Sequence, residues 1–325
     1  MSILSLLSLL AGVAIFMFGM LLIKYSLSEN FNEKTEALLK KFTSDRFSAT
    51  LTGTVATAAL QSSSASSVIT AALVDSGKLS LYSAFWIIVG ANLGTTFTGL
   101  LTAASFSDIA PFMCIVGTAL LTLTKSKRLN GAGIFFMGFG LLFVGMATMK
   151  AAVGDIRNSE IAYDILQNSS SPVTGLLTGC FFTALIQSSA ATTALLQTLA
   201  EDGLVGIRQC FYILLGANIG TCATCVIASS GLGSAAKRVS QMHTLYNFFG
   251  SVFFVLLSLV LPLPEMAEMF FPGDIKMQTG VLNVFFNLAA AVIVLLLPVK
   301  RFISSEKSNK INYLHSFPPV LKCNR

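Results

Sequence analysis

Charged residues are scarce in this chain. Asp, Glu, Lys and Arg make up 11% of its 325 residues and hydrophobic residues make up 54%, whereas charged residues account for about 25% of a typical soluble domain. Several apolar stretches approach or exceed the roughly 20 residues with which a helix crosses a bilayer. The composition therefore excludes an ordinary soluble domain and predicts an all-α polytopic membrane protein. The net charge of +6 follows from the membrane orientation argued below, not from nucleic-acid binding.

Residues that hold transition metals or form disulfides are also few. The chain has two histidines and six cysteines, and the cysteines show no disulfide framework. Cys222 and Cys225 form a C-x-x-C motif, but they lie in a predicted span, where a free cysteine behaves as a small hydrophobe. We therefore expect no transition metal and no cofactor.

Acidic residues are missing from the middle of every predicted span. Asp75, Asp108, Asp155, Glu201 and Asp202 all lie at the ends of apolar stretches. Carriers that couple to protons usually hold an ionisable group inside the membrane. The sequence therefore favours coupling to Na⁺ held by neutral oxygen atoms over coupling to protons.

What the chain does contain is a polar motif that occurs twice. Gln61-Ser62-Ser63-Ser64 interrupts the apolar run from Phe47 to Val74. Gln187-Ser188-Ser189 interrupts a second run, from Pro172 to Ala200, and the two motifs stand 126 positions apart.

The same offset relates longer stretches of the chain. It carries Gly90–Thr95 onto Gly216–Thr221, and residues 53–98 are identical to residues 179–224 at 17 of 46 positions without a gap. The chain is therefore a duplicated unit, and each copy presents the same cluster of amide and hydroxyl groups.

Each interrupted run has arms that are too short to cross the membrane. The arm before Gln61 has about 14 residues, which as a helix span about 21 Å, against a hydrocarbon core of roughly 30 Å. Two interpretations remain open at this point. The run is either one slightly polar spanning helix, or a re-entrant helical hairpin with the polar motif at its tip.

The apolar stretches follow the same order in both units. The N-terminus lacks the basic region and cleavage site of a signal peptide, so the first stretch is interpreted as a span. The expected segments are a first repeat at 1–128 with the hairpin at 47–74, a second repeat at 129–262 with the hairpin at 172–200, an extra C-terminal span within 263–299, and a basic tail at 300–325. This division predicts about seven membrane crossings.

Lysine and arginine predict the orientation. With both interrupted runs as hairpins, 17 of the 21 basic residues fall on one side of the membrane, and with both runs as single crossings the number is 15. The positive-inside rule favours the hairpins and puts the basic side in the cytoplasm, with the N-terminus outside. Each repeat then makes three crossings, and an odd number inserts the second repeat upside down, as an inverted repeat.

The tip of a re-entrant hairpin can bind anions or cations. The N–H groups at the start of its second arm lack partners within the helix, and the helix dipole adds a partial positive charge, which together favour an anion. The glutamine and serine oxygens of the motifs can instead ligate a hard cation such as Na⁺. Neither motif has a His, Lys or Asp nearby to activate a nucleophilic serine, so we do not expect an enzyme.

The Gly-Ala-Asn-x-Gly-Thr runs, Gly90–Thr95 and Gly216–Thr221, lie within predicted spans. Two glycines four residues apart permit close helix packing or local unwinding that exposes carbonyl groups. A packing motif with an interhelical hydrogen bond is the simpler explanation for one copy, but its duplication in register with the Gln-Ser motifs favours a functional site. His243 and Asn247 share one helix face, and Asn283 and Asn287 repeat that spacing.

These motifs resemble the sodium-dependent phosphate cotransporter family, the type II Na⁺/phosphate group and its bacterial relatives. The resemblance rests on the duplicated Gln-Ser-Ser-[Ser/Ala] motif, on Gly-Ala-Asn-[Leu/Ile]-Gly-Thr about thirty residues later, and on the run His243–Asn247. It covers the chain from about Gly12 to Pro298. Asn283 departs from it, because bacterial relatives often have His there.

The resemblance implies symport of inorganic phosphate with Na⁺ and a set of site residues. Phosphate would be bound by Gln61, Ser62, Ser63, Ser64, Gln187, Ser188 and Ser189. Na⁺ would be bound by Gln61, Asn92, Thr95, Gln187, Ser188, Asn218 and Thr221. Supporting helix contacts would come from His243, Asn247 and Asn287. Ala190 and Cys222 replace a serine and a threonine of the first copy, so the two halves are not equivalent.

We therefore expect a secondary active transporter in the plasma membrane, the inner membrane of a bacterium. Its partners would be phosphate, Na⁺ and the lipid bilayer, with no nucleic acid, and a homo-oligomer is left open. One alternative is a phosphate exporter or a carrier of another oxyanion such as sulfate. An alternative from another class is a membrane sensor that binds phosphate without transporting it.

Overall fold

The computed structural model describes residues 3–28, 42–104, 109–156 and 171–298, and all regular structure in them is helical. The twelve helices of these residues are α1 (Ile3–Ser28), α3 (Arg46–Leu60), α4 (Ser63–Asp75), α5 (Leu81–Ala103), α6 (Ala110–Leu123), α7 (Lys127–Ile156), α9 (Pro172–Ile186), α10 (Ser189–Glu201), α11 (Ile207–Ser230), α12 (Ser234–Ser258), α13 (Leu263–Phe270) and α14 (Ile275–Leu296). The expected all-α class is confirmed for the described residues.

The helices recur with the offset of the sequence repeat. α3, α4 and α5 begin 126 positions before α9, α10 and α11, respectively. α1 precedes α7, and α6 precedes α12, by an offset within two residues of that value. α14 has no counterpart in the first half of the described chain.

The number of helices able to span a membrane is smaller than expected. Five helices of the described residues are long and apolar enough, namely α1, α5, α7, α11 and α14, and a sixth span results if α12 and α13, which meet at 79°, are counted as one. The missing seventh is α6, whose 14 residues extend only about 21 Å. The expected seven crossings are thus five or six by length.

Glycines bring the long helices close to the first arms of the interrupted runs. A Cβ at Gly90 of α5 would overlap the carbonyl of Thr50 in α3, and one at Gly216 of α11 would overlap the carbonyl of Leu176 in α9. Similar overlaps occur at Gly53, Gly94, Gly179 and Gly220. α5 and α11 are continuous through these glycines. Of the two roles expected for the glycine pairs, the structure therefore has close packing and not unwinding.

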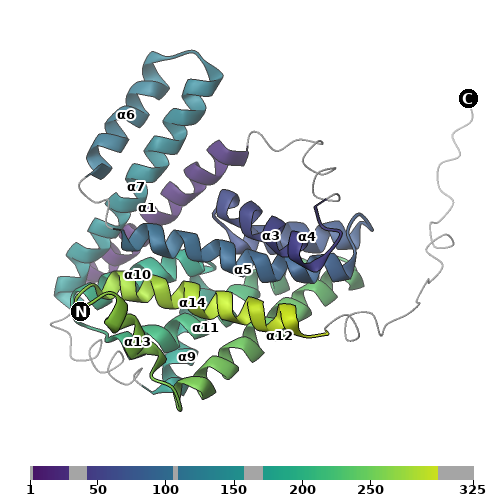
Figure 1. Ribbon diagram of the computed structural model, residues 1–325. Coiled ribbons are helices and arrows are strands. Elements are labelled where there is room, and N and C mark those ends of the chain that lie inside the picture. Colours follow the sequence, from purple (N-terminus) through teal and green to yellow (C-terminus); the bar gives the residue numbers. More distant parts are fainter. Residues whose placement is uncertain (1–2, 29–41, 105–108, 157–170, 299–325) are drawn as a thin grey trace, which may run out of the picture.

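The first helices of the two copies, α1 and α7, pack antiparallel. Gly12 lies against Gly145, and Gly19 lies against Gly138. Because the sequence offset makes Gly12 equivalent to Gly138 and Gly19 to Gly145, exchanging the copies turns one contact into the other. α6 packs along α7, and α6 and one end of α7 project away from the other helices (Figure 1).

The second arms, α4 and α10, lie inside the molecule. Both contact α5 and also α11, so each arm touches the long helix of its own copy and that of the other. Ala71 of α4 shares an apolar cluster with Cys225 of α11. At the equivalent position of α10, the polar Gln197 contacts Gly99 of α5.

Candidate binding site at two helix breaks

Both interrupted runs break at the glutamine of the repeated motif. Gln61 has φ 53° and Gln187 has φ 58°, and they are the two non-glycine residues with positive φ in the described chain. The left-handed conformation costs an ordinary residue about 1–2 kcal/mol. The surrounding packing therefore holds the same strained turn at both breaks.

The serine that follows each glutamine starts the next helix. Ser62 Oγ accepts a hydrogen bond from Ala65 N at 3.1 Å, and Ser188 Oγ accepts one from Ala191 N at 3.2 Å. Each serine thus satisfies one of the N–H groups that lack a partner in the first turn. The remaining first-turn N–H groups of α4 and α10 point toward the break.

A buried pair of hydroxyl groups ties the two arms of each run together. Thr57 Oγ1 donates to Ser66 Oγ at 2.7 Å between α3 and α4. Thr183 Oγ1 donates to Thr192 Oγ1 at 2.9 Å between α9 and α10. The two hydroxyl pairs are related by the offset of 126 positions, so the same kind of hydrogen bond links the two arms in both copies.

The two glutamine side chains differ in their partners. Gln61 Oε1 accepts from Thr98 Oγ1 at 2.7 Å, and Gln61 Nε2 donates to the carbonyl of Ala58 at 2.8 Å. Gln187 is exposed. Thr224, which corresponds to Thr98, has a buried Oγ1 without a hydrogen-bond partner among the described residues. A side-chain hydrogen bond therefore links the first break to α5, and no equivalent bond among the described residues links the second break to α11.

The serines of the two motifs also differ in exposure. Ser63 is 4% exposed, whereas Ser62, Ser64, Ser188 and Ser189 are half-buried. Ser62 and Ser188 accept the cap bonds through Oγ, and the half-buried Ser64 and Ser189 lie beside them in the first turns of α4 and α10.

A second polar group consists of asparagines from four helices. Asn92 Nδ2 of α5 donates to Asn247 Oδ1 of α12, and Asn247 Nδ2 donates to the carbonyl of Asn218 in α11 at 2.7 Å. Asn218 Nδ2 donates to Asn287 Oδ1 of α14 at 3.1 Å, and Asn287 Nδ2 donates to Asn283 Oδ1 at 3.0 Å. We call these five residues the asparagine cluster.

The asparagine cluster surrounds a small cavity. The cavity has a volume of about 10 Å³ and is lined by Asn92, Asn218, Asn247 and Asn287, and it is large enough for about one water molecule. The Oδ1 atoms of the equivalent residues Asn92 and Asn218 accept no hydrogen bond from the described residues. The cluster therefore offers two neutral oxygens, which are suitable ligands for a water or a hard cation.

Three other predicted residues take no part in these hydrogen bonds. The hydroxyl groups of Thr95 and Thr221 bond to carbonyls of their own helices, at 3.1 and 2.9 Å. His243 is fully buried, and neither of its ring nitrogens has a partner among the described residues. Cys222 lies against Asn247 Nδ2 at 3.2 Å, and both Cys222 and Cys225 are free and buried.

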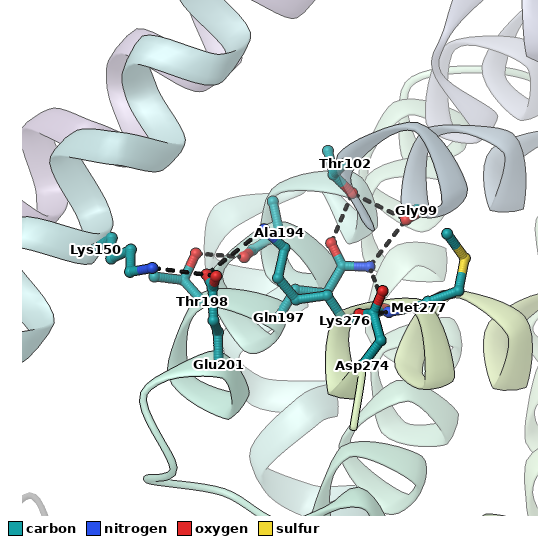
Figure 2. Close-up of polar contacts among 10 residues, drawn as sticks. All are labelled: Gly99, Thr102, Lys150, Ala194, Gln197, Thr198, Glu201, Asp274, Lys276 and Met277. Atoms are coloured by element: carbon teal, nitrogen blue, oxygen red, sulfur yellow. Dashed lines mark hydrogen bonds and ion pairs between the residues drawn. The ribbon is translucent and has the colours of Figure 1, made fainter. Parts of the chain in front are cut away.

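Sequence reasoning missed a buried polar group at the far end of α10. Gln197, Thr102 of α5 and the backbone of α14 meet there, and Glu201 forms ion pairs with Lys150 at 3.1 Å and Lys276 at 3.5 Å (Figure 2). The available signal was that Gln197 is polar where the first copy has Ala71.

The helices and the site define a multi-pass membrane protein with a duplicated polar centre. A family model described as Na⁺/Pi-cotransporter matches residues 15–151 and 157–271. The chain belongs to this family.

Individual relatives agree with the family match. The uncharacterized protein YqeW of Bacillus subtilis is 31% identical over 89% of this chain and 94% of its own length. The putative inorganic phosphate export protein YjbB of Escherichia coli is 25% identical over 90% of this chain, and the match spans 53% of that protein. The sodium-dependent phosphate transport protein 2A of Rattus norvegicus is 28% identical over 47% of this chain and 24% of its own length. No solved structure matches the chain.

Proposed function

We propose that this protein is a secondary active transporter that moves inorganic phosphate together with Na⁺ by alternating access. The observation that carries the proposal is the pair of equivalent helix breaks at Gln61 and Gln187 in a chain of this family. Two breaks with the same strained turn and the same serine cap form a duplicated binding element, as in carriers built from inverted repeats.

Phosphate would bind at the two breaks. The first turns of α4 and α10 present N–H groups and a positive dipole end to an anion. Gln61 and Ser62–Ser64 in the first copy, and Gln187, Ser188 and Ser189 in the second, would add side-chain hydrogen bonds. The half-buried hydroxyl groups and the exposed carboxamide of Gln187 support this assignment.

Na⁺ would be held by neutral oxygens. The uncommitted Oδ1 atoms of Asn92 and Asn218 support a cation at the asparagine cluster. The glutamines and Ser188 of the breaks are further ligands implied by the family resemblance. In the present geometry Thr95 and Thr221 bond to their own helices, so their hydroxyl oxygens would ligate Na⁺ through the remaining lone pairs.

Both interrupted runs would be re-entrant hairpins in an inverted repeat. α3 has 15 residues and α4 has 13, so each arm extends about 20 Å and ends within a hydrocarbon core of about 30 Å. The antiparallel contact of α1 with α7 supports a twofold relation between the copies. With α6 counted as a seventh crossing despite its 14 residues and with the basic residues inside, the N-terminus would lie outside a bacterial plasma membrane and the C-terminus in the cytoplasm.

Export is the second candidate for the direction of transport. The relatives from Escherichia coli and Salmonella typhimurium carry the name of a putative phosphate export protein, and this chain spans about half of their length. A carrier of another oxyanion is a related possibility, because helix N-termini recognise charge more than identity.

Uptake of radiolabelled phosphate into proteoliposomes tests the proposal. We expect uptake above equilibrium only with an inward Na⁺ gradient, and not with K⁺ or proton gradients. Gln61→Ala and Gln187→Ala should abolish uptake without preventing membrane insertion. Normal transport by either variant would refute the site, and unlabelled sulfate that competes as well as phosphate would identify a broader oxyanion carrier. Phosphate binding without concentrative uptake would favour the non-transporting sensor.

A further inference from the structure

A line of polar side chains runs along α5 from the first helix break to α10. Thr98 Oγ1 donates to Gln61 Oε1 at 2.7 Å. Thr102 lies one turn further on the same face of α5, and its Oγ1 lies 2.7 Å from Gln197 Oε1 of α10. We call Gln61, Thr98, Thr102 and Gln197 the α5 bridge. Between Thr98 and Thr102 the connection runs through the backbone of α5, because Thr102 Oγ1 also lies 3.0 Å from the carbonyls of Thr98 and Gly99. The α5 bridge thus joins the tip of the first hairpin to the helix that begins after Ser188.

The side chain of Gln197 is buried and hydrogen-bonded to two neighbouring helices. It is fully buried, and its Nε2 donates to the carbonyls of Gly99 in α5 at 2.9 Å and Lys276 in α14 at 3.3 Å. Figure 2 shows its amide between these two helices, with Thr102 on the oxygen side. A buried amide needs such partners. Two of these hydrogen bonds go to α5 and one goes to α14. Gln197 therefore helps to set the position of α10 along α5.

The second copy does not contain the corresponding bridge. The equivalent positions are held by Gln187, Thr224, Ala228 and Ala71. Gln187 is exposed, Thr224 Oγ1 has no partner among the described residues, and Ala71 packs in an apolar cluster with Cys225. The same helix crossing is therefore packed without polar contacts in one copy, which shows that the fold does not need a polar bridge at this place.

We propose that Thr102 and Gln197 are positioning residues of the binding site, which hold the carboxamide of Gln61 in a fixed relation to α10 and its Ser188 cap. The inference rests on the proposed function for the identity of the ligand. It assigns different roles to the two tips. Gln61 is preorganised by the α5 bridge, whereas Gln187 is left to move when the ligand arrives.

Two variants break the α5 bridge, and one neighbouring variant serves as their control. Gln197→Ala removes all three bonds, and Thr102→Val removes one hydroxyl group. Thr198→Val is the matched control, because Thr198 is 2% exposed, lies on the same helix and bonds only to the carbonyl of Ala194. Each is reconstituted, and the concentration of phosphate at half-maximal uptake and the maximal rate are measured. Hydrogen–deuterium exchange is followed at residues 58–66.

The bridge predicts a change in affinity and in local protection. Since a hydrogen bond changes an equilibrium by about 3- to 10-fold, the half-saturating phosphate concentration should rise by that factor in Gln197→Ala and Thr102→Val, with the maximal rate within about twofold. Exchange at residues 58–66 should become faster in both. Thr198→Val should change neither quantity, and unchanged affinity and exchange in Gln197→Ala would overturn the inference.

Replacing both partners by apolar side chains separates positioning from packing. The double variant Thr102→Val, Gln197→Leu fills the space of the native pair without its hydrogen-bonding groups, and such a replacement can be nearly neutral for stability. It leaves Gly99 unchanged, where a Cβ would approach Asn283 and Thr193. It should regain the thermal stability lost in Gln197→Ala but keep the weakened affinity and the faster exchange at residues 58–66. Recovery of both would show that only packing matters and would overturn the inference. If the native protein neither binds nor transports phosphate, the proposed function fails, and the exchange measurement alone decides on the bridge.

Discussion

Equivalent threonines in the two copies should respond in opposite directions to the same substitution. Thr98→Val removes the hydroxyl group that donates to Gln61 Oε1 and leaves a carboxamide oxygen unpaired, which costs about 2 kcal/mol. Thr224→Val removes a buried hydroxyl group that has no partner among the described residues. Replacing an unsatisfied buried hydroxyl by a methyl group should stabilise the protein by about 1 kcal/mol.

Thermal unfolding of the purified protein in detergent measures this difference. With about 2 °C per kcal/mol for a chain of this size, Thr98→Val should lower the unfolding temperature by about 4 °C, and Thr224→Val should raise it by about 2 °C. The two variants control for each other, because the substitution is the same and the two positions are equivalent in the repeat. A fall of similar size in both would refute the reasoning that the two tips are held differently.

Three further substitutions test the packing around the site. Gly90→Ala places a Cβ against the carbonyl of Thr50. It should lower the free energy of unfolding by about 2 kcal/mol despite the better helix propensity of alanine. Gly131→Ala is the control, because a Cβ there meets nothing within 4 Å, and it should not lower the free energy of unfolding. Asn247→Leu removes the bonds to Asn92 and Asn218 and should lower the unfolding temperature by about 4 °C or more and abolish Na⁺-dependent uptake; retained uptake contradicts the role given to the asparagine cluster. Glu201→Gln breaks two ion pairs that are partly exposed and should cost at most about 1 kcal/mol; an effect that persists undiminished in 1 M salt would argue against an electrostatic contribution.

The duplicated breaks were the part of the fold that the sequence could predict. A polar cluster inside an apolar run marks a place where a spanning helix is unfavourable, and its recurrence at a constant offset marks the same place in the second copy. The expected runs 47–74 and 172–200 correspond to α3–α4 and α9–α10. The left-handed turns at Gln61 and Gln187 could not be predicted, because glutamine is an ordinary helix former.

Fewer helices of the described residues are long enough to cross a membrane than the sequence has apolar stretches. Apolar character identifies α6 as a membrane segment, but its helix ends at Leu123, after 14 residues. The last long helix of the second repeat, α12, ends at Ser258, and the chain turns by 79° into α13. Pro262 and Pro264 follow directly, and proline cannot continue a helix. The prolines thus indicated where the helix ends, whereas the apolar pattern did not.

Polar partners that are remote in sequence limited the prediction of the site. The motifs identified Asn92 and Asn218 as candidates. They do not show that Asn247 of α12 hydrogen-bonds to both of these residues, which lie in α5 and α11. Gln197 was missed because its partners lie 95, 98 and 79 positions away. Only the packing of α10 against α5 and α14 gives it a role.

The two copies keep one backbone plan and differ in the polar contacts built on it. The strained glutamine, the serine cap and the hydroxyl pair between the arms occur in both, so the structure of the helix break is retained in both copies. The side-chain hydrogen bond from Thr98 to the glutamine at the break, Gln61, is found in the first copy alone among the described residues. Under the proposed function, a tip that is already held loses less entropy on binding the ligand than a free tip does. One held tip and one free tip would then combine preorganised binding at Gln61 with a ligand-dependent movement at Gln187, and the difference between Thr98 and Thr224 is the contact on which this asymmetry depends.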